Sequence, residues 1–157
     1  MSRVDVSTLL FFDASCLIAA VISPTGGAGF LWGLCERGFL QAAVSQLVLT
    51  EVARNLASKL DPGYLELHRQ QLRTCAPYMS PVPRLDGQPR MYPEINAKDE
   101  HVVAAALAIR ADLILTLDRP LAKEIERAAL DLPVRSPGDF IKLDLISHPF
   151  YSRLRQE

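Results

Sequence analysis

Two short runs of apolar residues each end in an aspartate, and they constrain the fold more than any other feature of the sequence. Residues 8–12 lead into Asp13, and residues 113–117 lead into Asp118. Continuously apolar runs of this length are typical of strands buried on both faces of a parallel sheet. The sequence therefore predicts a sheet covered by helices on both faces, with an acid at the end of each of these two strands.

Helical patterns separate the apolar runs along the chain. The predicted strands are 8–12, 39–44, 113–117 and 133–135, with an edge strand at about 79–83. The predicted helices are 14–21, 29–37, 45–60, 64–74, a helix capped by Asn96 with its body at 102–109, 120–130, and a short last helix opened by 136–140. Strands that alternate with helices predict an α/β fold, a three-layer sandwich with a central, mostly parallel sheet.

Length and charge indicate one globular domain without a strong electrostatic field. We expect a single domain at 1–157, with a core at about 8–143 and a short tail at 145–157. The 17 basic and 18 acidic side chains give a net charge of −1, so nucleic-acid binding has to be local. Three cysteines without CxxC spacing are expected as buried thiols, and no run reaches the roughly 20 apolar residues of a membrane helix. We therefore expect a cytoplasmic protein that is not bound to membranes.

Four acids from four different elements form the candidate site. Asp13 and Asp118 follow buried strands, at the edge where open α/β sheets bind ligands. Glu51 and Asp99 lie on helices, at the borders of their apolar stripes. Carboxylates are the ligands that Mg²⁺ and Mn²⁺ prefer, and a bound ion acidifies water and neutralises phosphate charge. The pattern predicts a divalent metal site for phosphodiester hydrolysis.

Each acid also has a structural interpretation when it is taken alone. Asp13 and Asp118 are suited to cap the helices that follow them. Asp99 is suited to the first turn of a helix, where it complements the helix dipole, and Glu51 to a solvated helix face. The order and context of the four acids together favour the metal site.

These segments resemble the PIN-domain family, and more closely its VapC-like toxin branch in prokaryotic toxin–antitoxin systems. The resemblance covers residues 9 to about 143 and rests on five segments: 10–15 (LFFDAS), 45–52 (SQLVLTEV), 99–108, 111–118 (ADLILTLD) and 136–140 (SPGDF). The first four segments match the motifs that carry the family's metal-site acids, here Asp13, Glu51, Asp99 and Asp118.

The resemblance implies an Mg²⁺- or Mn²⁺-dependent ribonuclease, a homodimer, and an antitoxin that blocks the acidic cleft. Within it, Ser15 and Thr116 would steady ligands or waters, and Asp112 would be either structural or an outer partner. Glu100 is an alternative to Asp99 because the two acids are adjacent. The rival hypothesis is a non-catalytic PIN-like scaffold that binds RNA or protein.

Three other features receive less specific interpretations. Residues 26–29 (GGAG) lack the ending of a phosphate-binding loop and are expected to be flexible. The histidines are scattered and are interpreted as helix-surface or loop residues: His68, His101 and His148. A basic and aromatic set is equally consistent with RNA or partner contacts and with an ordinary solvated surface: Arg69, Arg73, Arg84, Arg90, Tyr92 and the tail 150–155.

Overall fold

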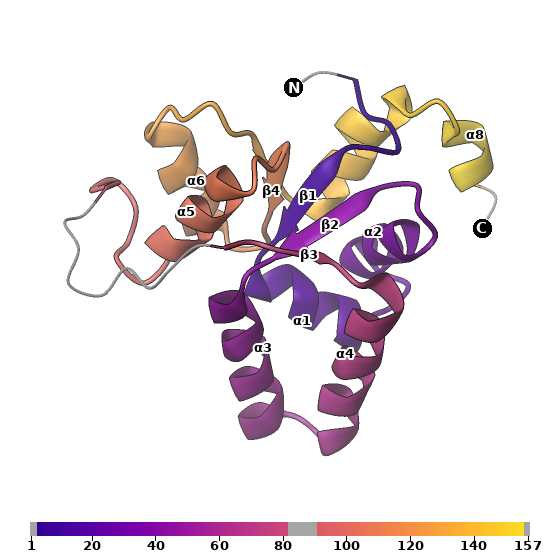
Figure 1. The fold of residues 1–157 in the computed structure, drawn as a ribbon, viewed down its shortest axis with the longest axis horizontal. Coiled ribbons are helices and arrows are strands. Elements are labelled where there is room, and N and C mark those ends of the chain that lie inside the picture. The colour runs from indigo at the N-terminus through magenta and orange to yellow at the C-terminus, as the bar shows by residue number, and fades with distance from the viewer. Residues whose placement is uncertain (1–2, 82–90, 156–157) are drawn as a thin grey trace.

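The sheet is all-parallel in the computed structural model, which describes residues 3–81 and 91–155 (Figure 1). Its strand order is β3-β2-β1-β4-β5, so β1 and β4 are neighbours at its centre. The strands are β1 (Leu9–Phe12), β2 (Gln41–Val44), β3 (Tyr78–Met79), β4 (Leu113–Leu115) and β5 (Val134–Arg135). This architecture confirms the predicted α/β fold.

Helices cover both faces of this sheet and complete the three layers. In Figure 1, α1, α3 and α4 lie below the sheet, whereas α5 and α6 lie above it. The helices are α1 (Ala14–Ile22), α2 (Gly27–Glu36), α3 (Gln46–Lys59), α4 (Pro62–Cys75), α5 (Glu100–Ala108), α6 (Arg119–Arg127), α7 (Pro137–Asp139) and α8 (Tyr151–Leu154), with the short turns η1 (Phe140–Asp144) and η2 (Leu145–Ser147) between the last two.

The central strands are apolar because they have no solvent-facing side. Phe11, Phe12 and all three residues of β4 are fully buried. The Phe12 ring packs edge-on against Trp32 of α2, with ring centroids 5.0 Å apart. The core also includes Leu145 and Leu154, so the segment expected to be a tail packs onto the domain.

The order of the strands creates a crevice between β1 and β4. The chain adds β2 and then β3 on one side of β1, and afterwards crosses back to place β4 on the other side. The connections leaving β1 and β4 therefore diverge at the carboxyl edge, and such a switch point is where open α/β sheets bind ligands.

Several element ends differ from the sequence-based predictions: β3 is Tyr78–Met79 where the sequence predicts an edge strand at about 79–83, and α6 ends at Arg127 rather than at residue 130. Two further differences lie close to the candidate acids. Asn96 does not cap α5, because its side-chain oxygen accepts the N–H of Lys98 at 3.1 Å and closes a separate turn. The helix begins at Glu100 instead. Strand β4 ends at Leu115 rather than at residue 117, since Thr116 turns toward β1 and Leu117 is 48% exposed.

The glycine-rich segment is not a flexible loop, because α2 begins at Gly27. A Cβ atom on Gly29 would lie 2.3 Å from the backbone oxygen of Pro24, so only glycine fits where α2 passes this turn. A Cβ atom on Gly33, one turn later, would have nothing within 4 Å. The tight turn explains Gly29 without any phosphate-binding role.

We expect Gly29→Ala and Gly33→Ala to change stability in opposite directions. Gly29→Ala should lower the free energy of unfolding by about 1–3 kcal/mol, because the clashing atoms belong to the backbone. Gly33→Ala should raise it by about 0.5–1 kcal/mol through helix propensity. Urea unfolding of both variants measures the two changes. Equal stabilisation by both substitutions would refute the close approach at Gly29.

None of the described helices is by itself long and apolar enough to cross a membrane. The pair α1 and α2 passes that test together by length and composition, but the two helices meet at 93°.

Candidate active site

Asp13 is held rigidly at the carboxyl end of β1. Its side chain is 4% exposed and caps α1. Its Oδ1 accepts hydrogen bonds from Ser15 Oγ (2.6 Å) and from the N–H of Cys16 (3.0 Å). Its Oδ2 accepts the hydroxyl of Thr116. Burial raises the pKa of Asp13, and the charge of Asp118 adds to that rise, whereas the three hydrogen bonds oppose it.

Two hydroxyls join the ends of β1 and β4. Ser15 Oγ donates to Asp13 and accepts the N–H of Leu117 at 2.9 Å. Thr116 Oγ1 donates to Asp13 and accepts the N–H of Asp118 at 3.0 Å. Ser15 and Thr116 therefore fix both the Asp13 carboxylate and the backbone that carries Asp118.

The two aspartates keep acceptor capacity toward the crevice. A carboxylate oxygen accepts about two hydrogen bonds. Oδ1 of Asp13 is saturated, whereas Oδ2 receives one bond. Asp118 caps α6 by accepting the N–H of Leu121 at Oδ1 (3.1 Å), and its Oδ2 accepts nothing from the described residues. Both cap interpretations are therefore correct, and capping leaves oxygens available to a cation.

Asp99 is the acid that is most affected by the others. It lies half-buried at the start of α5 and makes no capping bond. Burial raises the pKa of Asp99 to about 6, the charges of Asp118, Glu124 and Glu51 add to the rise, and the nearby Lys98 opposes it. Asp99 thus lies within electrostatic range of acids on two other elements, namely α3 and α6 with its cap.

Glu51 reaches the same region from α3. Its side chain is exposed, so it faces solvent more fully than its helical position beside Val48 predicts. Its charge acts on Asp99 and also on His101, whose pKa is lowered by burial. The structure therefore brings Glu51 and Asp118 within electrostatic range of Asp99, and Asp118 also within range of Asp13.

The four acids offer the type of ligand that hard divalent cations prefer, because each side chain provides carboxylate oxygens. Their present arrangement is looser than a formed metal site. No three His, Cys, Asp or Glu side chains in residues 3–81 and 91–155 are close enough together to hold an ion. Ion binding would require the side chains at the rim, Glu51 and Asp99, to turn toward Asp13 and Asp118.

Glu124 is an acid near this site that sequence reasoning missed. It lies on α6, acts electrostatically on Asp99, and accepts the N–H of Asn96 at 2.6 Å. It thereby ties the segment before α5 to α6. The sequence did offer a sign that Glu124 borders the buried face of its helix. It lies three residues after Leu121 and one before Ile125, and both of these residues are buried.

Two other acids from the sequence analysis have structural roles. Glu100 is buried and its Oε1 accepts the N–H groups of Met91 (2.6 Å) and Tyr92 (3.1 Å). Asp112 lies at the opposite end of β4, where its Oδ2 accepts the N–H of Leu9 at 2.7 Å. Asp112 and Asp13 therefore lie at opposite ends of the sheet's central strands. This separation favours a structural role for Asp112 over a role as an outer partner of the metal site.

The interpretation of the histidines as helix-surface or loop residues is wrong for His68, which is buried on α4, whereas His148 does lie in a loop but is buried there. His68 and His148 are each 3% exposed. His148 bridges the C-terminal segment to the core, with Nε2 2.8 Å from the oxygen of Phe39 and Nδ1 accepting the N–H of Phe150. The Nδ1 atom of His101 is buried without a hydrogen-bond partner.

The basic and aromatic set does not form one surface in the described residues. Arg73 pairs with Glu66 at 3.3 Å on the exposed face of α4. In the tail, Arg153 lies over the ring of Phe150. Arg84 and Arg90 lie outside the described residues.

Comparison with known families supplies an independent assignment of the fold. A family model described as a PIN domain matches residues 10–120, which is most of the chain and contains all four acids as well as Ser15 and Thr116. No curated protein matches the chain.

Proposed function

The chain belongs to the PIN domain family, and on this premise we propose that it is a metal-dependent endoribonuclease that hydrolyses RNA phosphodiester bonds. PIN domains are generally nucleases and usually use divalent metal ions. The finer assignment, to RNA and to a toxin of a toxin–antitoxin pair, rests on the motif resemblance to the VapC-like branch.

The observation that carries the proposal is a buried carboxylate that pairs with no Lys or Arg side chain of residues 3–81 and 91–155. Asp13 is almost fully buried at the switch point, and its described partners are two hydroxyls and a backbone N–H. Asp118 follows on the adjacent strand and raises the pKa of Asp13 further. Repulsion between a buried acid and a half-buried neighbour destabilises the fold unless a cation offsets it, so this arrangement favours a cation site.

The chain's own residues have separate tasks in this proposal. Asp13, Asp118, Asp99 and Glu51 would hold Mg²⁺ or Mn²⁺. When bound, such an ion supplies charge neutralisation at a phosphate and acidification of water. Ser15 and Thr116 orient Asp13, because each donates its hydroxyl hydrogen to one carboxylate oxygen.

We also propose a homodimer, and a cognate antitoxin that covers the acidic crevice. The second candidate function is a non-catalytic PIN-like scaffold that binds RNA or protein. The looseness of the acids favours this alternative, since no three of them within the described residues are grouped to hold an ion. Cleavage activity separates the two functions.

The test is cleavage of labelled structured and unstructured RNAs by the purified protein with Mn²⁺, Mg²⁺ or EDTA. We expect cleavage with either ion, none in EDTA, and none by Asp118→Asn. Asp61→Asn is the matched control, because Asp61 also caps a helix and is followed by proline, but lies between α3 and α4. In a bacterial host, induced expression of the wild type should stop growth, and Asp118→Asn should not. RNA binding without cleavage under all conditions would favour the scaffold.

A further inference from the structure

A cavity of about 640 Å³ opens beside Asp118, and it is lined by cationic, apolar, hydroxyl and carboxylate side chains. It lies between α6 and the turn that joins β5 to α7, and we call it the α6 groove. Cations line it from α6, an apolar side chain comes from the end of β4, and a hydroxyl and a carboxylate come from the turn. These residues are Arg119, Lys123, Leu117, Ser136 and Asp139, and the acids Asp118 and Glu126 line the cavity as well. Its volume is in the range of sites that bind small organic molecules.

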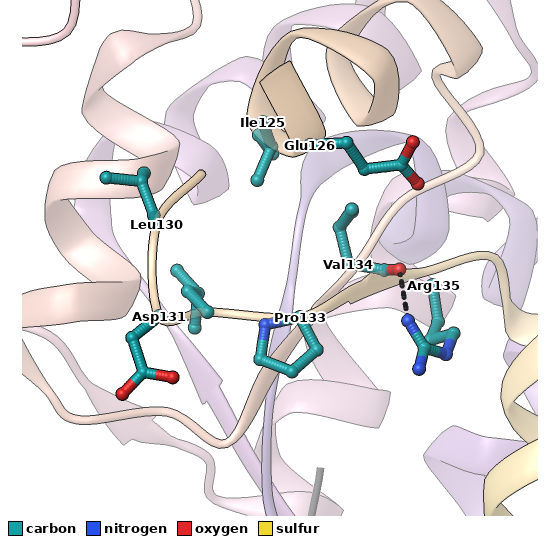
Figure 2. A pocket seen from close by; sticks show the side chains of 8 residues that line it. Ile125, Glu126, Leu130, Asp131, Pro133, Val134 and Arg135 are labelled. Atoms are coloured by element: carbon teal, nitrogen blue, oxygen red, sulfur yellow. Dashed lines mark hydrogen bonds between the residues drawn. The ribbon is translucent and has the colours of Figure 1, made fainter. Parts of the chain in front are cut away.

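The α6 groove continues into a second cavity of about 260 Å³, which Figure 2 shows. The two cavities share Glu126, Val134 and Arg135. Glu126 and Arg135 lie at one end of the second cavity, and Leu130 and Asp131 lie at the other (Figure 2). The second cavity therefore adjoins the α6 groove on the side of these shared residues.

Arg119 and Lys123 are the cations of α6 that line the α6 groove. Arg119 and Lys123 are four residues apart, so they lie on one helix face about 5–6 Å apart. Both side chains are exposed, and neither forms an ion pair with a described residue. Arg135, by contrast, is paired with Asp144 at 3.0 Å. Arg119 and Lys123 are therefore available to an anionic ligand such as a phosphodiester strand.

Leu117 presents an apolar surface next to the acids. Its side chain is 48% exposed, although it lies between Thr116 and Asp118. Its backbone is fixed, because its N–H donates to Ser15 Oγ at 2.9 Å. An exposed side chain on a rigid backbone gains free energy when a flat apolar ligand group, such as a nucleobase, covers it.

The turn opposite α6 offers groups that hydrogen-bond to sugar hydroxyls. Ser136 Oγ accepts the N–H of Asp139 at 3.1 Å, which leaves its own hydroxyl hydrogen free to donate. The Asp139 carboxylate is exposed and accepts no hydrogen bond from the described residues. A ribose 2′-hydroxyl both donates and accepts, and it distinguishes RNA from DNA.

We propose that the α6 groove binds the ribonucleotide of the substrate strand next to the bond that is cut. Arg119 and Lys123 contact its phosphates, Leu117 contacts its base, and Asp139 with Ser136 contacts its 2′-hydroxyl. This inference rests on the proposed endoribonuclease function and adds the site that positions the strand and selects RNA.

The first experiment measures the affinity for a short single-stranded RNA as a function of salt. It uses Asp13→Asn protein, verified as folded by circular dichroism, so that the strand stays intact with Mg²⁺ present. Arg119→Ala and Lys123→Ala should each weaken binding about three- to tenfold, and each should reduce the slope of log K against log salt by about 0.7. Arg127→Ala, on the same helix but outside the groove, is the matched control and should change neither.

The second experiment compares RNA with DNA of the same sequence. Asp139→Ala should reduce the ratio of RNA affinity to DNA affinity by about tenfold, because it removes one hydrogen bond to a charged group. Asp61→Asn is the control, because Asp61 is an exposed acid that lines neither of the two cavities. An unchanged RNA-to-DNA ratio in Asp139→Ala would overturn the 2′-hydroxyl contact.

The outcomes separate this inference from the proposed function. One outcome is that the wild type cleaves RNA while Arg119→Ala and Lys123→Ala bind it with unchanged affinity and salt slope. In that case the α6 groove does not bind the substrate strand, and the proposed endoribonuclease function is unaffected. If neither the wild type nor the Asp13→Asn protein binds RNA, and the wild type does not cleave it, both proposals fail.

Discussion

Asp13→Asn is expected to abolish RNA cleavage, by more than about a hundredfold, while the protein stays folded. Replacing a residue that only orients a metal ligand costs 10- to 100-fold, so losing the charge of a proposed ligand should cost more. The fold survives because the asparagine oxygen can accept from Ser15 and Cys16, as Oδ1 of Asp13 does. Its amide group can donate to Thr116 Oγ1.

The measurement is the initial rate of RNA cleavage with Mn²⁺, together with a urea unfolding curve for each protein. Asp61→Asn, the control used for Asp118, should retain full activity. Asp13→Asn protein that is folded and cleaves at the wild-type rate would show that this carboxylate has no part in the reaction.

Asp99→Asn is expected to make the metal-free protein more stable at neutral pH and to make it inactive. The pKa of Asp99 is raised to about 6 by burial and by neighbouring acids, from an ordinary value of 3.8. Between these two values the folded protein holds the proton more tightly than the unfolded chain, so its stability falls as the pH rises. Asparagine does not ionise and therefore avoids this loss.

We expect Asp99→Asn to raise the free energy of unfolding at pH 7 by about 1 kcal/mol. The full effect of the raised pKa would be larger, but solvent screens a half-buried group and reduces it. The gain should disappear below about pH 4, where Asp99 is protonated in both states. Urea unfolding in EDTA across this pH range measures it, with Asp131→Asn as an exposed control. A variant less stable than the wild type at pH 7 would contradict the proposed repulsion among the acids.

The parts of the fold that follow from local pattern were predictable. The runs at residues 8–12 and 113–117 lack the polar alternation of a half-exposed strand, which identified the central strands β1 and β4 and placed Asp13 and Asp118 after them. The family motifs added Glu51 and Asp99. Their electrostatic influence on one another depends on how α3 and α5 pack, which no local pattern specifies.

The errors arose where tertiary contacts override local preference. Asn96 is a good helix cap by type, but buried Ile95 holds the segment before α5 in a separate turn. The glycine-rich run 26–29 suggested a flexible loop before a helix at 29–37, whereas α2 already begins at Gly27 and the close approach of Pro24 requires glycine at position 29 inside it. Glu124 was missed because its neighbours, Asn96 and Asp99, lie on a segment distant in sequence.

The most direct test of the central claim, that these acids together hold one divalent cation site, is calorimetric titration of the protein with Mn²⁺. We expect the wild type to bind Mn²⁺, and Asp13→Asn, Asp118→Asn, Asp99→Asn and Glu51→Gln each to bind it more weakly. Asp61→Asn should bind it as the wild type does. Identical titrations for the wild type and all four site variants would contradict the claim.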